Sequence, residues 1–195
     1  NLKLGSKSRK SLRYDQRTLA KQGWVSFECW EGFEDVRSMM PTTCLVEVDS
    51  KKGKEGAGLY SIRGKRAFFF ELLPELTKAS NVRLTILRLN EQAIAWQLDL
   101  LGKNYLAVHH LSFDEKWKKY SPGRQLLRHN LEMAWKERRT IDFLPLAFDY
   151  KQKLATEREE VHELHWFKRS IRGWIACHLI RWNMKLRQKM RDRKK

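Results

Sequence analysis

The chain has 195 residues, of which 42% are hydrophobic, and its formal net charge at pH 7 is +17. This length allows one full-sized domain with a sizeable core, or one domain with appended helices. Three widely spaced cysteines form no metal-ligand pattern and argue against a disulfide scaffold, so we expect no metal and a reducing compartment. The sequence has no signal peptide and no run of about 18 apolar residues, so we expect a cytoplasmic protein without a membrane span.

The positive charge is concentrated at the two ends of the chain. Residues 1–24 contain seven Lys or Arg and one Asp, and residues 168–195 contain eleven Lys or Arg and one Asp. Residues 25–167 have a net charge of +1. We therefore expect a basic N-terminal helix (1–24), a nearly neutral central domain (25–167) and a basic amphipathic C-terminal helix (168–195). The chain begins with Asn1 rather than Met, which suggests that an upstream domain is missing.

Hydrophobic periodicity predicts a mixed sequence of helices and strands. Three consecutive strands on short turns predict an antiparallel meander, and the helix after the third strand predicts a crossover to a further strand. The fold class we expect is α+β, with a mostly antiparallel sheet flanked by helices. The expected helices are 6–22, 31–40, 65–79 (kinked or ended near Pro74) and 122–138, the expected strands are 24–30, 82–90, 93–101, 105–113, 140–144 and 158–167, and residues 41–50 fit either type.

The start of the helix at 122–138 is a candidate anion site. Ser121 is a suitable N-cap, Pro122 suits the first helical position, and Gly123, Arg124 and Gln125 follow in the first turn. A helix start carries backbone N–H groups without intrahelical partners and the positive end of the helix dipole, so it accepts phosphate well. A well-capped helix start without a ligand fits the same residues.

A glycine- and lysine-rich stretch at 50–58 is predicted to be a loop. It is not a P-loop, because Gly53-Lys54 is followed by Glu55 rather than Ser or Thr. Its candidate substrate-binding residues are Lys52, Lys54 and Glu55, in a loop that covers a ligand. A flexible turn without a ligand is the alternative.

The ordered set of local motifs resembles the GNAT acyltransferases, and within them the cellulose-biosynthesis (CelD-like) type, which is also similar to the FemAB-type transferases. The resemblance covers most of residues 6–167. It is carried by the start SKSRKSLRYDQRTLAKQG (6–23), the loop at 50–58, Tyr120-Ser121-Pro122-Gly123 before a leucine-rich helix, Ile141-Asp142-Phe143-Leu144, and Tyr150-Lys151.

The resemblance implies acyl transfer from a thioester donor to an amine or hydroxyl, with the pantetheine arm of acyl-CoA entering between two splayed strands. The pyrophosphate would rest on the N–H groups of residues 123–125. The base candidates are His109 and His110, of which only one should face the cleft because neighbours on a strand point oppositely. Tyr150 is the candidate acid, Lys151 follows it, and Asp142 would orient one of these groups or cap the chain.

The donor and the partners remain open. The chain lacks the longer two-glycine signature common in GNAT enzymes, so acetyl-CoA or another acyl-CoA is the expected donor and an aminoacyl-tRNA the alternative. The expected acceptor is a sugar, amino sugar or similar molecule of envelope or polysaccharide metabolism.

The basic ends add further alternatives. Interleaved Trp, Leu and cations at 168–195 fit an anionic membrane surface, a nucleic acid, or packing on the chain's own domain. The alternative functions are therefore a nucleic-acid-binding module and an inactive GNAT-like scaffold.

Overall fold

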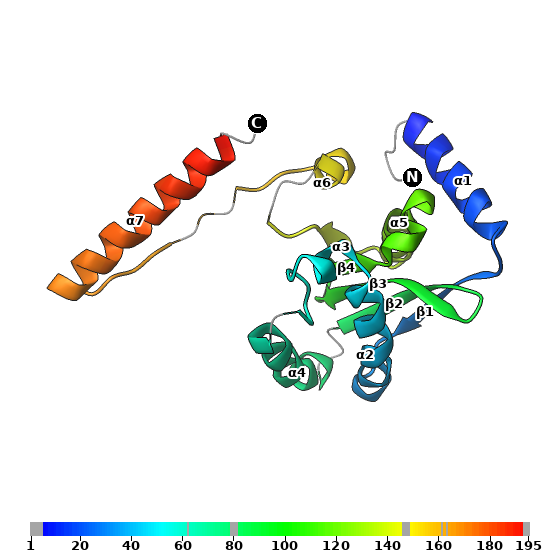
Figure 1. Cartoon of the computed structure of the whole chain (residues 1–195), viewed down its shortest axis with the longest axis horizontal. Helices are drawn as coiled ribbons and strands as arrows, with labels where there is room; N and C mark the ends of the chain where they lie inside the picture. Colours follow the sequence, from blue (N-terminus) through cyan, green and yellow to red (C-terminus); the bar gives the residue numbers. More distant parts are fainter. Residues whose placement is uncertain are drawn as a thin grey trace. The chain divides into compact units, whose positions relative to one another are not determined.

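The computed structural model describes residues 6–61, 63–78, 82–145, 149–160, 162 and 164–192. It divides into two compact units, one ending at Thr156 and the other beginning at Glu157. The predicted boundary between 167 and 168 stays a prediction. The elements, all but η1 and β5 labelled in Figure 1, are α1 (Ser6–Ala20), β1 (Val25–Trp30), α2 (Phe33–Val48), α3 (Lys51–Lys54), α4 (Arg63–Lys78), β2 (Val82–Leu89), β3 (Gln92–Leu101), β4 (Tyr105–Phe113), the 3₁₀ helix η1 (Glu115–Tyr120), α5 (Pro122–Lys136), β5 (Thr140–Asp142), α6 (Asp149–Leu154) and α7 (Ile171–Asp192).

The first unit is built on a five-stranded sheet in the order β1-β2-β3-β4-β5. The strands β1 to β4 pair antiparallel, as the short connections predict for β2, β3 and β4, and β5 pairs parallel to β4 after the α5 crossover. The predicted α+β fold class, with a mostly antiparallel sheet flanked by helices, is confirmed. Both central strands are buried along nearly their whole length because helices cover both faces of the sheet.

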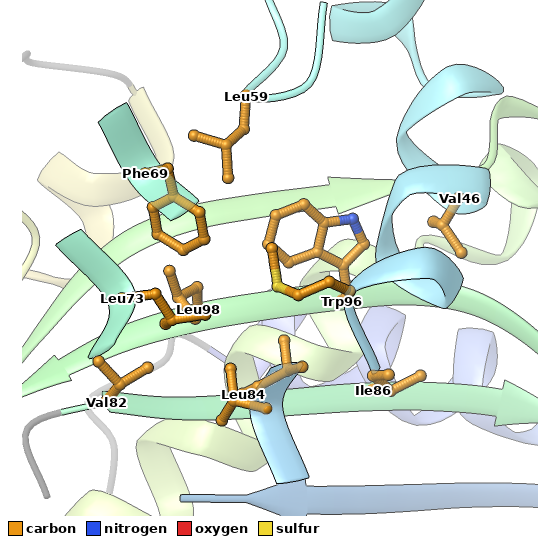
Figure 2. Close-up of a cluster of buried hydrophobic side chains, with 11 residues drawn as sticks. Val46, Leu59, Phe69, Leu73, Val82, Leu84, Ile86, Trp96 and Leu98 are labelled. Atoms are coloured by element: carbon orange, nitrogen blue, oxygen red, sulfur yellow. The ribbon is translucent and has the colours of Figure 1, made fainter. Parts of the chain in front are cut away.

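One face of the sheet packs against α2 and α4. Trp96 belongs to this core and is 1% exposed; in Figure 2 Phe69 and Leu98 lie to one side of it, Val46 of α2 to the other, and Leu84 and Ile86 below it. A buried aromatic side chain of this size contributes about 3 kcal/mol or more, so Trp96 anchors this layer.

The opposite face packs against α1 and α5. Leu19 of α1 and Leu126 of α5 meet Leu87 of β2, while Leu127 and Leu131 of α5 pack on β4. The alternation of side chains along β2 sends Leu84 and Ile86 to one face and Leu87 to the other, which is how one strand serves both cores.

Two prolines lie inside helices. The stretch 31–50, predicted as a short helix followed by an ambiguous segment, forms α2 with Pro41 inside it, and α4 continues past Pro74 to Lys78. An internal proline removes one helical hydrogen bond. In α2 the burial of Val36 and Met40 on the sheet offsets that loss.

The predicted loop at 50–58 contains one helical turn, α3, capped by the Ser50 hydroxyl, which accepts from the Gly53 N–H at 3.1 Å. The predicted strand at 158–167 is wrong. Its described residues form neither helix nor strand, and Leu164 and Trp166 are almost fully exposed. Alternation of apolar residues does not by itself form a strand, because a strand also needs a neighbouring strand to which its backbone can hydrogen-bond.

A buried polar group lies beneath α5. The Asp99 carboxylate of β3 accepts hydrogen bonds from the Gln97 amide at 2.7 Å and from the Asn130 amide of α5 at 3.2 Å. Burial raises the pKa of Asp99 to about 7, although the Gln97 hydrogen bond and the charge of Arg83 oppose the shift. The folded state therefore holds a proton on this carboxyl at pH values where the unfolded chain has lost it.

This shift gives a testable pH dependence of stability. Because the folded pKa of Asp99 lies above its ordinary value of 3.8, its contribution to stability is full below about pH 4 and is lost as the pH rises toward 7, by up to about 1.4 kcal/mol per pH unit. Asp99→Asn should flatten the pH dependence of the free energy of unfolding over this range, measured by urea denaturation. An unchanged slope in the variant would show that Asp99 is ionised in the folded protein.

Candidate active site

A β-bulge in β4 places the two candidate histidines. Leu98 pairs with His110 and Asp99 pairs with Val108, so His109 is the extra residue that faces no partner on β3. A bulge breaks the alternation of side chains and leaves the extra residue out of the ladder. The expectation that the two histidines point oppositely assumed a regular strand, and the register shift removes that assumption.

The other side of β4 is open beyond its first residues. The parallel pairing with β5 joins only residues 105–107 to residues 140–142, whereas β4 continues to Phe113. Among the described residues no strand pairs with β4 beyond Ala107 on this side. The edge of β4 beyond Ala107 therefore has no strand partner where β5 diverges, although the Leu111 carbonyl accepts a hydrogen bond from Lys52 Nζ.

His110 is held by a buried carboxylate that the sequence analysis did not single out. Its Nε2 lies 2.7 Å from Oε2 of Glu47 in α2, and its ring stacks on Trp96 at a centroid distance of 4.9 Å. The other carboxylate oxygen of Glu47 accepts from the Tyr60 N–H at 2.7 Å. Glu47 thus joins α2, β4 and the segment after α3.

Two opposing effects set the protonation of Glu47. Burial of the carboxyl, which is 1% exposed, would raise its pKa. The hydrogen bonds from His110 and the Tyr60 N–H, with the charges of His110 and Lys52, outweigh burial and hold the pKa of Glu47 below its usual value. A buried carboxylate is therefore kept ionised beside the imidazole.

His109 has a different environment. Its side chain is exposed, whereas the side chain of His110 is only 13% exposed. Partial desolvation of the ring by neighbouring residues lowers the pKa of His109, and the positive charges of His110 and Lys52 lower it further. A histidine with a lowered pKa is neutral at pH 7 and can accept a proton.

Of the three candidate substrate-binding residues, only Lys52 reaches the histidines' strand. Lys52 Nζ donates to the Leu111 carbonyl of β4 at 2.7 Å. Burial lowers the pKa of Lys52, and the positive charge of Lys151 lowers it further. The negative charge of Glu47 opposes this shift. Lys54 is exposed, and Glu55 forms a surface ion pair with Lys51 at 3.7 Å.

The start of α5 lies against β4 as predicted, but its cap differs. Ser121 has φ 53° and ψ 48°, and its side chain makes no cap hydrogen bond, so the predicted N-cap interaction is wrong. The physical reason is that Ser121 also ends η1, where its N–H donates to the Lys118 carbonyl at 2.9 Å in a left-handed conformation. Pro122 occupies the first turn as expected.

The predicted anion-binding groups are partly engaged within the protein. The N–H groups of Arg124 and Gln125 both donate to the Ser121 carbonyl, and the Gln125 side chain donates to the Tyr120 carbonyl at 2.8 Å. The Gly123 N–H has no acceptor among the described residues. A Cβ at Gly123 would lie 2.9 Å from a methyl of Leu111, so glycine permits this close approach of helix and strand.

Arg124 is bound by α1. Its guanidinium forms an ion pair with Asp15 and a hydrogen bond to the Ser11 hydroxyl at 2.9 Å. A ligand phosphate at this helix start would therefore compete with Asp15 for Arg124.

The segment after β5 carries the remaining candidates. Asp142 Oδ1 accepts from the Leu144 N–H at 2.7 Å, so it caps the turn. Lys151 Nζ donates to the Phe143 carbonyl and to the Leu144 carbonyl, the latter at 3.4 Å, and burial lowers its pKa against the charge of Asp142. Tyr150 is in α6, but its side chain lies outside the described residues.

A family model described as "Acetyltransferase (GNAT) domain" matches residues 6–152 of this chain. The chain belongs to the GNAT acetyltransferase family. This confirms the predicted acyltransferase class. None of the curated proteins compared with the chain matches it.

Solved structures show the same GNAT fold at low sequence identity. An aminoglycoside acetyltransferase from an uncultured soil metagenomic sample is 13% identical, with 74% of this chain and 97% of that chain covered; its complexes with trehalose and with sisomicin give TM-scores of 0.51 and 0.50. A second aminoglycoside acetyltransferase of the same source type is 11% identical, with 74% and 99% covered and a TM-score of 0.50.

The described part of this GNAT chain contains no group of three or more His, Cys, Asp or Glu that could hold a metal ion. The site instead gathers one buried carboxylate, two histidines and a lysine around the bulge. The sequence had one signal for Glu47: it follows Val36, Met40 and Thr43 at helical spacing, on a face that is otherwise apolar. That signal was hidden because residues 41–50 could not be assigned to a helix.

Replacing Glu47 should destabilise the protein. Glu47→Gln leaves the Tyr60 N–H and His110 with a weaker acceptor, so we expect a loss of about 1–3 kcal/mol at pH 7 by urea denaturation. Because the folded pKa of Glu47 is lowered, its contribution is present above about pH 4.5 and is lost as the pH falls through the folded pKa, so the two proteins should converge in acid.

The matched control is Glu55→Gln, which removes an exposed carboxylate and should change stability by less than about 0.5 kcal/mol. Equal stability of Glu47→Gln and the unmodified protein at pH 7 would contradict the assigned role of Glu47.

Proposed function

We propose that this protein transfers an acyl group from acyl-CoA to an amine or hydroxyl of a sugar, amino sugar or similar acceptor. The observation that carries the proposal is the open edge of β4: β5 pairs with only three of its residues, and the bulge at His109 lies directly beyond them. An extended, amide-containing pantetheine arm can hydrogen-bond such an edge as an added strand would.

The proposed phosphate site is the start of α5, which meets β4 at Gly123. The helix dipole and the Gly123 N–H favour an anion there, and Arg124 adds a cation. The structure provides Lys52 and Lys151 near the same strand as further positive charge. Acyl-CoA is strongly anionic, so the charge of this region suits the donor better than it suits a polycationic acceptor.

His109 is the proposed base. It reaches solvent, where an acceptor arrives, and its lowered pKa keeps it neutral. His110 is committed to Glu47 and Trp96, which makes it a positioning residue for the bulge.

In the proposed reaction His109 removes a proton from the acceptor amine or hydroxyl, and the freed lone pair attacks the thioester carbonyl. Collapse of the tetrahedral adduct breaks the carbon–sulfur bond. The backbone N–H groups of the bulge would stabilise the oxyanion, and Tyr150 stays the predicted acid that protonates the leaving thiolate.

The acceptor and the subfamily remain proposals. The cellulose-biosynthesis or FemAB-like type and a role in polysaccharide metabolism rest on the sequence resemblance, and a cytoplasmic location rests on the cysteine pattern. Trehalose and sisomicin, bound in the structural neighbours, are practical first compounds for an acceptor screen.

Acetyl-CoA titration tests the donor site with a matched pair of variants. Arg124→Gln and Asp15→Asn break the same ion pair, so they disturb α1 and α5 to a similar degree. If Arg124 contacts the phosphates, Arg124→Gln should weaken binding about tenfold, equivalent to roughly 1.4 kcal/mol. Asp15→Asn should tighten binding, because it frees the cation. The measurement is the dissociation constant by isothermal titration calorimetry.

Equal affinities for both variants and the unmodified protein would remove Arg124 from the donor site. Absence of saturable binding in all three would overturn acetyl-CoA as the donor and direct attention to aminoacyl-tRNA.

The pH profile of the rate tests His109. Protonated His109 cannot act as a base, and its pKa lies below the ordinary 6.5. We therefore expect kcat to keep its full value at pH 7 and to fall only below about pH 6.5. His109→Gln should lower kcat by about 10²- to 10⁴-fold and abolish that acid limb. The control is His129→Gln in α5, because His129 also has a lowered pKa but stacks on Phe27 of β1. An acid limb that survives in His109→Gln would assign the base elsewhere.

A further inference from the structure

The second unit contains α7, where six of the seven exposed large apolar side chains among the described residues share one face. Residues at spacings of three and four lie on the same side of a helix. Six apolar residues follow this spacing and all are exposed: Ile171, Trp174, Ile175, Leu179, Trp182 and Leu186. Trp174 and Trp182 are each 63% exposed.

This helix is locally well formed. Ser170 caps its start by accepting from the Gly173 N–H at 3.1 Å, and the His178 ring packs on Trp174 at a centroid distance of 4.1 Å. The apolar face is therefore presented by an ordered helix. Exposed Trp, Ile and Leu in such a row are costly in water, which indicates a surface that is covered in use.

The charge of the same segment restricts what covers it. Residues 168–195 carry eleven Lys or Arg and one Asp, and eight of those cations follow Ile180. A second copy of the segment would bring two charges of +10 together, which opposes self-association. A nucleic acid would satisfy the cations but would leave the aliphatic side chains Ile171, Ile175 and Leu179 in water.

We propose that α7 binds the surface of an anionic lipid bilayer, with its row of six apolar residues inserted at the headgroup boundary and its cations on lipid phosphates. A lipid surface matches both features, since it offers apolar depth to Trp, Ile and Leu and negative charge to Lys and Arg. None of the described helices is long and apolar enough to cross a membrane. The inference is independent of the donor and acceptor proposed above.

Vesicle flotation with the full chain tests this inference. The protein should float with vesicles that contain roughly one-third phosphatidylglycerol and should bind pure phosphatidylcholine vesicles much more weakly. The double variant Trp174→Ala/Trp182→Ala should lower the partition coefficient about tenfold or more. Arg181→Gln should lower it about fivefold.

The matched control is Met184→Ala. Met184 is 51% exposed on the same helix, but its position falls on the opposite side from Trp182, so partitioning should be unchanged. Far-ultraviolet circular dichroism verifies that each variant keeps its helix content.

Three results would overturn the inference. They are vesicle binding that the double Trp variant retains, binding to a duplex RNA probe without binding to anionic vesicles, and concentration-dependent dimers by light scattering that the double Trp variant abolishes. Acetyl-CoA affinity should be the same in all α7 variants, so failure here is distinguishable from failure at the donor site.

Discussion

The candidate active site depends on one buried carboxylate. Glu47 accepts from His110 on β4 and from the Tyr60 N–H at 2.7 Å each, so one side chain fixes a strand and a loop to α2. Removing a carboxylate from water is costly, and only such hydrogen bonds and nearby positive charge make the ionised form stable there. Gly58 contributes by its size, because a Cβ there would lie 2.4 Å from Glu47 Oε1.

Strand pairing supplies the second constraint. A sheet edge normally exposes unpaired N–H and C=O groups, which most proteins shield. Here β5 covers only the first residues of β4, and the bulge follows immediately, so an edge is left open inside the sheet. Contacts on both faces keep β4 in place despite this interruption: His110 stacks on Trp96 on one side, and β4 packs against Leu127 and Leu131 of α5 on the other.

Charge is divided between the site and the ends of the chain. The central residues 25–167 are nearly neutral, yet the charge of Lys151 lowers the pKa of Lys52, and the charge of Lys52 lowers the pKa of His109. Desolvation of the ring lowers the pKa of His109 most, and this local positive charge adds to the effect, so both favour the neutral imidazole. The larger basicity of residues 168–195 is displayed on a helix with an apolar face, where it serves attachment rather than proton transfer in the scheme proposed here.

The sequence alone determined the fold class, the meander of β2, β3 and β4, the α5 crossover and the family resemblance, because these follow from local periodicity and short turns. It also placed His109 and His110 on the correct strand. Only the tertiary structure decided that residues 33–48 form one helix, since burial against the sheet overrides an internal proline. The Glu47–His110 pair, the capture of Arg124 by Asp15 and the bulge at His109 join residues distant in sequence or shift the pairing between strands, and no local pattern encodes them. The prediction of a strand at 158–167 was wrong for the same physical reason. The alternation of apolar residues is a local pattern, whereas the neighbouring strand that a β-strand must hydrogen-bond to comes from elsewhere in the chain.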